Sequence, residues 1–431
     1  MLDQRQQIFP QAFRKKIILS ASVGNMLEIY DFALYGYFAP IIAQLFFPRT
    51  DKFMSLLATF GVFALGFLMR PLGAMLFGYF GDRIGRKKTL SASIILMAVP
   101  TTLIGLLPTY AQIGVWAGVL LLICRLLQGL ATGGEFTGSI IYITEHAPST
   151  RRGLYGSWAM SSTFTGFLIG SGVSALFSSL LSAESLSLWG WRVPFVLGFV
   201  LGIVGLYLRL RMPETPYFLA IQAENKLVKN PLFSAFKEGY KTMLIVAALN
   251  FLPAASYYLS FVYLSSYFAI YLKLPLHTAL TINTISMFVL TLVTPFMGFL
   301  SDKIGRKPML VTGALGFIVF AYPLFLLMQL KTFTAVFLAQ LGFTLLVGCL
   351  FSVIPATLVE LVKTNIRYTA ISFPYNLSSA IFGGIMPLVA TFLIEKTGNL
   401  VAPSFYLICG GIVMIVTVFF FEESFRKQSL N

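Results

Sequence analysis

Five ionisable residues lie inside long apolar segments of this sequence. They are Glu28, Asp31, Arg70, Arg125 and Glu135. A charge at the centre of a bilayer costs at least about 2.5–3.5 kcal/mol on insertion scales, so such residues mark ion or substrate pathways. Carboxyl groups can bind and release protons, and a guanidinium matches a carboxylate with two parallel hydrogen bonds. These residue types therefore indicate proton and carboxylate chemistry within a membrane.

The spacing of these residues predicts two polar stripes on helices. Steps of three and four residues keep side chains on one helical face. The first stripe contains Gly24, Glu28, Asp31 and Tyr35, and the second contains Arg125, Gln128, Thr132 and Glu135. Because polar stripes are untenable against lipid, we expect them to face a central cavity or each other.

The two acids of the first stripe are three residues apart, and neighbouring like charges disfavour joint ionisation. We therefore expect Asp31 or Glu135 to carry a coupled proton. Glu28 is the third candidate, and Arg125 is the expected counter-ion that changes with conformation. The alternative is that these residues form mutually neutralised ion pairs that hold the helices together.

Composition indicates a membrane protein. Hydrophobic residues make up 57% of the 431 residues and charged residues only 11%, against about 25% charged in soluble domains. Apolar stretches long enough to cross a bilayer as helices recur along the chain. The predicted fold is an all-α membrane protein with twelve transmembrane helices, at 17–47, 54–80, 89–107, 112–143, 152–180, 190–212, 241–270, 277–301, 309–328, 333–362, 366–394 and 402–421.

The net charge of +15 does not call for a nucleic-acid partner. Most Lys and Arg residues lie in the two tails and in alternate loops, which is the pattern of the positive-inside rule. We therefore expect an integral protein of the cell membrane (a bacterial inner membrane), with both termini cytoplasmic. His146 and His277 are too few for a metal site, and the three cysteines lack metal-ligand spacing.

The chain contains a duplicated half. The polar segment from Gly81 to Lys88 is repeated around Asp302, close to half the chain away. A second repeated segment runs from Glu145 to Arg152 and from Glu360 to Arg367. We predict two six-helix bundles, at 1–212 and 241–431, joined by a cytoplasmic linker at 213–240. Gly81 and Gly85 are expected to supply positive φ angles in the short loop.

The segment Gly78-x-x-Gly81-Asp82-Arg83-x-Gly85-Arg86-Lys87 resembles the signature loop of the major facilitator superfamily. Segments beginning at Gly24, Arg70 and Arg125 narrow the resemblance to the metabolite:proton symporter family. This resemblance implies alternating access driven by a proton gradient, with the signature loops latching the cytoplasmic side. The gating residues expected from the two repeats are Asp82, Arg83, Arg86, Glu145, Arg152, Asp302, Arg306, Glu360 and Arg367.

Arg70 is the residue expected to bind substrate, because its guanidinium suits the carboxylate that substrates of the resembled family carry. The alternative, to which we give equal weight, is that Arg70 forms an ion pair inside the protein with Asp31 or Glu28. The further expected substrate-binding residues are Tyr35, Gln128, Asn250, Tyr257, Tyr375 and Asn376. Tyrosines at this depth can surround a quaternary ammonium by cation–π attraction, although packing is the commoner role.

The sequence thus predicts a proton-coupled symporter that imports a small carboxylated or zwitterionic metabolite. The alternative function is a proton-coupled efflux antiporter. The expected partners are the solute, the proton and the lipid bilayer. No cofactor, no enzymatic activity and no nucleic acid are expected, and we expect a monomer.

Overall fold

The computed structural model describes residues 11–47 and 52–423, and within them every regular element is helical. The two chain ends, which we expect to be cytoplasmic, lie outside these residues. Eleven helices are long and apolar enough to cross a membrane, and the shorter apolar helix Pro403–Phe419 follows them. The predicted all-α fold with twelve spans in two bundles is confirmed.

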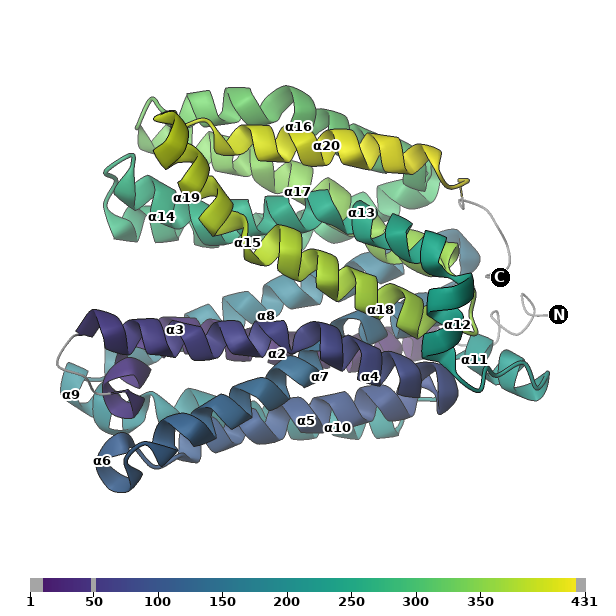
Figure 1. Cartoon of the computed structure of the whole chain (residues 1–431), viewed down its shortest axis with the longest axis horizontal. Helices are drawn as coiled ribbons and strands as arrows, with labels where there is room; N and C mark the ends of the chain where they lie inside the picture. The colour runs from purple at the N-terminus through teal and green to yellow at the C-terminus, as the bar shows by residue number, and fades with distance from the viewer. Residues whose placement is uncertain (1–10, 48–51, 424–431) are drawn as a thin grey trace.

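The first bundle forms one lobe, drawn in purple through blue to teal in Figure 1. Its elements are α2 (Gln11–Phe46), α3 (Lys52–Leu68), α4 (Arg70–Arg83), α5 (Arg86–Leu106), α6 (Tyr110–Ile113), α7 (Trp116–His146), η1 (Ser149–Arg151), α8 (Arg152–Leu180), α9 (Ala183–Ser185), η2 (Leu186–Gly190) and α10 (Arg192–Leu210).

The second bundle forms the other lobe, drawn in teal through green to yellow in Figure 1. Its elements are α13 (Tyr240–Tyr257), η3 (Tyr258–Tyr263), α14 (Leu264–Ile270), α15 (Leu276–Ile304), α16 (Arg306–Met328), α17 (Phe333–Leu361), α18 (Arg367–Ser378), η4 (Ser379–Gly384), α19 (Met386–Thr397) and α20 (Pro403–Phe419). Between the lobes in sequence lie α11 (Pro216–Ala223) and α12 (Pro231–Glu238), at one end of the molecule. We call this the linker end.

Three predicted spans depart from regular α-helix. The second span is interrupted at Met69, where α3 ends and α4 begins with Pro71 in its first turn, a position that tolerates a missing N–H. The seventh and eleventh spans each contain a π-helical segment, η3 and η4. Such wide turns often occur at functional sites.

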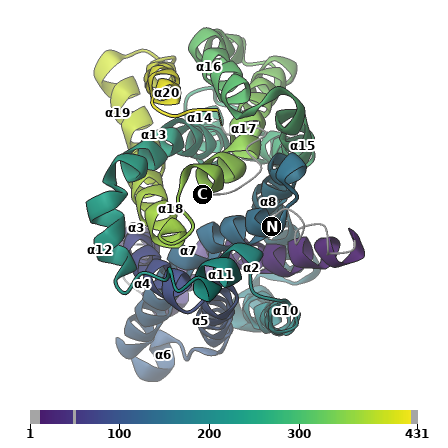
Figure 2. The same ribbon diagram turned by 90° about the vertical axis from the view of Figure 1, so that its right-hand side faces the viewer.

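The lobes meet mainly along two helix pairs, α8 with α15 and α4 with α18, and α7 and α17 also contact the opposite lobe. The end-on view of Figure 2 shows both pairs between the lobes. Small residues allow this approach, since a Cβ on Gly78 would meet the backbone of Thr369, and a Cβ on Gly153 would meet the carbonyl of Gly298. Glycine at these two positions therefore permits the close contact between the lobes.

One loop prediction was wrong for Gly81. Positive φ occurs at Gly85 (109°) and at its repeat Gly305 (114°), whereas Gly81 is a helical residue of α4. A Cβ on Gly81 would overlap the ring of Tyr368 from the other lobe. Gly81 is therefore required for space between the lobes, and Gly85 for the turn.

Candidate functional site: buried ion pairs and the latch between the lobes

The acids of the first stripe form two separate ion pairs. Arg70 Nη2 lies 3.1 Å from Glu28 Oε1, and Arg125 Nη1 lies 2.5 Å from Asp31 Oδ2. Glu28 therefore faces α4 and Asp31 faces α7, although both are on α2. The Arg70 side chain is 12% exposed, whereas Asp31 and Arg125 are exposed by 0% and 2%. Of these two pairs, the Arg70–Glu28 pair is the one that solvent can approach.

The third pair involves a residue that sequence reasoning missed. Glu135 is bound by Arg209 of α10 and not by Arg125, with a 2.8 Å bond from Arg209 Nη1 to Glu135 Oε2. Ser93 donates to the same carboxylate at 2.5 Å, and Arg209 also donates to the backbone carbonyl of Leu90. The sequence did not single out Arg209 as an intramembrane charge, because it is near the basic end of the sixth span. The pair joins three helices of the first lobe.

Aromatic rings surround the Arg70–Glu28 pair. The Arg70 guanidinium lies 4.2 Å from the ring centre of Phe67 and 4.9 Å from that of Phe32. Both distances are within the range of cation–π attraction. Arg70 Nε and Glu28 Oε2 are buried and have no hydrogen-bond partner among the described residues. The pair therefore retains unused donor and acceptor capacity at the boundary between the lobes.

Tyrosines of the second lobe contact aromatic rings of the first. The three ring pairs are Tyr257 with Phe164 (5.8 Å, stacked), Tyr258 with Phe67 (6.2 Å, edge-on) and Tyr375 with Phe136 (5.3 Å, tilted). Tyr258 was not among the expected binding residues. An aromatic layer thus crosses from one lobe to the other beside Arg70.

The remaining expected binding residues make intramolecular bonds. Tyr35 donates to the Thr59 carbonyl at 2.9 Å, and Gln128 donates to Thr101 Oγ1 at 2.7 Å. Asn250 and Asn376 bond mainly to the backbone. Asn250 donates to the Tyr375 carbonyl at 3.0 Å and to Ser379 Oγ at 2.8 Å, and Asn376 donates to the Gly133 carbonyl of the first lobe at 3.1 Å. These residues support helices and the lobe boundary in this conformation.

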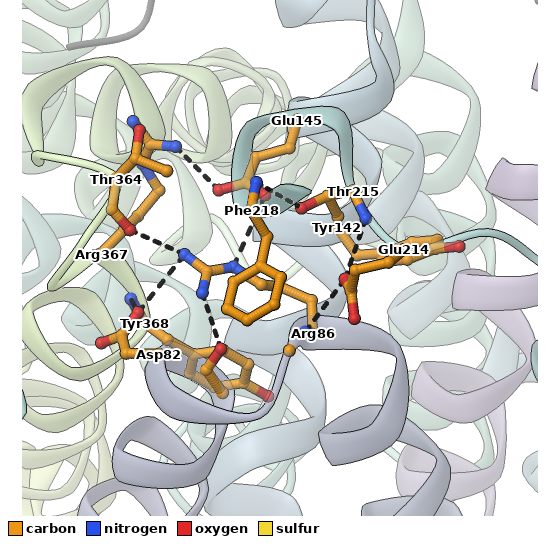
Figure 3. A network of polar contacts seen from close by, with 12 residues as sticks. Asp82, Arg86, Tyr142, Glu145, Glu214, Thr215, Phe218, Thr364, Arg367 and Tyr368 are labelled. Carbon is orange, nitrogen blue, oxygen red and sulfur yellow. Dashed lines mark hydrogen bonds and ion pairs between the residues drawn. The ribbon is translucent and has the colours of Figure 1, made fainter. Parts of the chain in front are cut away.

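At the linker end, the signature loop of the first lobe binds the second lobe (Figure 3). The Asp82 carboxylate accepts hydrogen bonds from the backbone N–H groups of Tyr368 at 3.0 Å and Thr369 at 2.9 Å. These groups belong to the first turn of α18, whose positive helix-dipole end stabilises the carboxylate. Arg86 lies 3.3 Å from Asp82 and donates to the Thr364 carbonyl at 2.8 Å. The first loop thus caps a helix of the other lobe.

The second signature loop repeats this arrangement in the opposite direction. Asp302 accepts from the backbone N–H groups of Gly153 and Leu154, each at 2.8 Å, in the first turn of α8. Arg306 donates to Asp302 at 2.9 Å, and at the equivalent position Arg86 forms its ion pair with Asp82. Each lobe therefore supplies the acid that caps a helix of the other, and we call these two sites together the latch.

Buried ion pairs reinforce the latch. Arg367 Nη1 donates to Glu145 Oε1 at 2.7 Å across the lobes, and Arg86 Nε lies 3.5 Å from the same carboxylate. In the second copy, Glu360 lies 3.3 Å from Arg306 and 3.8 Å from Arg152. Eight of the nine expected gating residues thus come together. Arg83 does not, because it is exposed and bonds to Tyr79 of its own helix.

Two further acids bind the signature loops: Glu214, which lies before α11, and Glu423, which lies after α20. Glu214 accepts from the backbone N–H groups of Arg86 and Lys87, each at 3.1 Å, and burial raises the pKa of its carboxyl above the ordinary 4.5. Glu423 accepts from the N–H groups of Arg306 at 3.1 Å and Lys307 at 2.8 Å. Sequence reasoning missed both, although each follows the last span of its half, which was an available signal.

Comparison with known proteins identifies the family. Residues 17–231 match the family described as "Sugar (and other) transporter", and residues 246–431 match the "Major Facilitator Superfamily". The chain is 36% identical to the glycine betaine/proline/ectoine/pipecolic acid transporter OusA of Dickeya dadantii, over 96% of this chain and 84% of that protein. It is 35% identical to the proline/betaine transporter of Escherichia coli K12, with the same coverage.

The chain belongs to the major facilitator superfamily. Within it, the near full-length identity to proline/betaine transporters places the chain in the metabolite:proton symporter family. A putative proline/betaine transporter of Staphylococcus aureus is also 35% identical, over 97% of this chain and 90% of that protein.

Solved structures of this superfamily share the fold. The chain superposes on the proton:xylose symporter XylE bound to 6-bromo-6-deoxy-D-glucose with a TM-score of 0.79, at 19% identity and 96% coverage of both chains. The TM-score to the inward-open conformation of XylE from E. coli is lower, 0.65, at 19% identity, covering 97% of this chain and 98% of that one.

Proposed function

We propose that this protein imports a small zwitterionic solute of the proline or betaine type together with a proton. The names of its relatives support this class of solute. The observation that carries the proposal is the Arg70–Glu28 pair, which lies among aromatic rings at the lobe boundary and has unused bonding capacity. A guanidinium for the carboxylate and rings for the cation match the two ends of such a solute.

Binding and proton coupling are linked through Arg70. The solute's carboxylate approaches Arg70 and takes the place of Glu28, which is then a buried carboxylate without its cation. A buried unpaired charge is costly, so Glu28 binds a proton. We therefore rank Glu28 as the first proton carrier, ahead of Asp31, whose partner Arg125 is more deeply buried. Glu135 ranks last, because Arg209 and Ser93 both bind its carboxylate.

Alternating access follows from the latch. The linker end faces the cytoplasm, since the basic signature loops lie there and obey the positive-inside rule. The closed latch then corresponds to an outward-facing or occluded state, and its opening releases solute and proton inside the cell. The two lobes of a single chain form the complete transport path, so a monomer in the bacterial inner membrane is sufficient.

Transport in proteoliposomes tests this function. The purified protein is expected to accumulate labelled glycine betaine or proline when an inward proton gradient is imposed, and a protonophore abolishes the accumulation. A dicarboxylate and shikimate serve as comparison solutes. Net outward movement of a hydrophobic cation, with no uptake of any zwitterion, would establish the efflux antiporter instead.

Two substitutions separate binding from coupling. Arg70→Gln removes the partner of the carboxylate, and we expect about a tenfold or greater loss of solute affinity, since a charged hydrogen bond contributes about 1.5–3 kcal/mol. Glu28→Gln is expected to keep solute exchange while losing uphill accumulation. Lys331→Gln, an exposed change at the opposite end, is the matched control. Full uphill accumulation by Glu28→Gln would refute the coupling role.

A further inference from the structure

A groove of about 410 Å³ lies between α2 and α8, on a different surface from the ion-pair site. Its apolar walls include Leu19 and Met26 of α2 and Leu154 and Trp158 of α8. Leu19 is 51% exposed and Trp158 is 43% exposed, so the groove opens to the outside of the helix bundle. In a membrane protein, that surface faces lipid.

The groove carries a cation at one end and an unsatisfied hydroxyl within it. Arg151 lines its linker end, is exposed, and forms no ion pair with any residue that the structure describes. Ser22 is only 4% exposed, and its Oγ has no hydrogen-bond partner among the described residues. A buried polar group without a partner is costly, which indicates that a ligand atom completes the site.

The spacing and charge suit one kind of ligand. Trp158 is seven residues beyond Arg151, which is roughly 10 Å along a helix at 1.5 Å per residue. The chain also presents Lys16 as an exposed cation one turn before Leu19, and none of the lining residues is acidic. A ligand here needs an anionic group at the membrane surface, acceptor oxygens just below it and an apolar portion deeper still.

We propose that this groove binds one anionic phospholipid. The headgroup phosphate binds Arg151, an ester oxygen accepts a hydrogen bond from Ser22, and an acyl chain lies along Trp158 and Met26. The groove is joined to the latch through Leu154, which lines the groove and whose backbone N–H binds Asp302. The bound lipid therefore stabilises the first turn of α8 in the position that the closed latch requires.

Fluorescence quenching of Trp158 tests the site without reference to transport. The chain has four tryptophans, and among them only Trp158 lines the groove. The signal of Trp158 is the difference between the wild type and Trp158→Phe in bilayers that contain a small fraction of brominated-chain lipid. We expect brominated phosphatidylglycerol to quench this signal at least about twofold more than brominated phosphatidylcholine at the same fraction.

Substitutions assign the preference to the groove. Arg151→Gln is expected to remove the preference for phosphatidylglycerol, and Ser22→Ala to reduce it, while Lys88→Gln, another exposed basic residue of the linker end, leaves it unchanged. Melting temperatures like that of the wild type would show that the variants fold. Equal quenching by the two lipids in the wild type would overturn the proposal, as would a preference that survives Arg151→Gln in the folded protein.

Discussion

The Asp82 carboxylate of the first lobe accepts a hydrogen bond from the backbone N–H of Tyr368 in the second lobe, at 3.0 Å. Its repeat, Asp302, binds the N–H of Gly153 in the reverse direction at 2.8 Å. Because the positive dipole end of each capped helix also favours the negative charge of the carboxylate, the latch depends on charge at two positions and not on apolar contact alone.

Asp82→Asn is expected to open the linker end. Asparagine keeps one acceptor oxygen but loses the charge that favours the start of α18, and hydrogen bonds to charged groups contribute about 1.5–3 kcal/mol each. The population with the latch open should rise about tenfold or more. Spin labels at the exposed positions Ile84 and Lys363 would measure the separation of the lobes.

Arg83→Gln is the control for this prediction, because Arg83 is exposed and bonds within its own helix. Its distance distribution should match that of the wild type. An unchanged distribution in Asp82→Asn would contradict the role assigned to the helix cap.

Glu135→Gln should destabilise the fold instead of uncoupling transport. The substitution leaves Arg209 buried without its counter-charge, and breaking a buried pair in this way costs about 3–5 kcal/mol. We expect a lower melting temperature in Glu135→Gln and in Arg209→Gln, and a smaller loss in the double variant Glu135→Met/Arg209→Met. Normal stability with loss of uphill accumulation would restore Glu135 as the proton carrier that the sequence suggested.

Glu214 is expected to make stability depend on pH. Burial raises the pKa of its carboxyl above the ordinary 4.5, so the folded state holds a proton that the unfolded state releases. The stabilisation is present below pH 4.5 and is lost as the pH rises through the raised pKa. Melting temperatures between pH 4 and pH 8 should therefore fall more in the wild type than in Glu214→Gln. Parallel curves would show that Glu214 does not contribute.

Gly166→Ala tests the packing of α8 against α2. A Cβ on Gly166 would lie 2.8 Å from the Met26 Cα, and overpacking of this kind typically costs about 1–3 kcal/mol. Gly172→Ala, on the same helix, meets nothing within 4 Å and should be neutral or slightly stabilising. Equal melting temperatures for the two variants would mean that the helices separate without cost.

The fold and the residues of the latch could be predicted from the sequence, because both depend on local sequence patterns. Long apolar runs predicted the spans, and the repeated loop placed Asp82 and Asp302 together with their arginines. The one expected gating residue that lies outside the latch, Arg83, does so for a local reason as well. Arg83 lies in the signature loop but on the solvent side of the last turn of α4, so membership of a motif did not indicate its direction.

The partners of the intramembrane charges could not be predicted. Which face of one helix meets another depends on packing along their whole length. The sequence therefore left the partner of Arg70 open between the solute and an internal acid, Asp31 or Glu28. For the same reason it did not assign Arg209 to Glu135, because these residues are on different helices and 74 positions apart. Burial of Arg209, a residue of α10, arises only when α2, α5 and α7 pack around it.

The wide turns at Tyr258–Tyr263 and Ser379–Gly384 lie in the second lobe, whereas the three mid-membrane ion pairs lie in the first. The first lobe also has a π-helical segment, η2, but it lies between two spans, so the wide turns inside spans belong to the lobe without these ion pairs. A π-turn accommodates one residue more than an α-turn, so removing a single residue from Tyr258–Tyr263 would allow this turn to close to regular α-helix without changing the face that α14 presents. The one-residue surplus therefore sets the positions of the rings inside the wide turn, Tyr258 and Tyr263, while α14 keeps its phase.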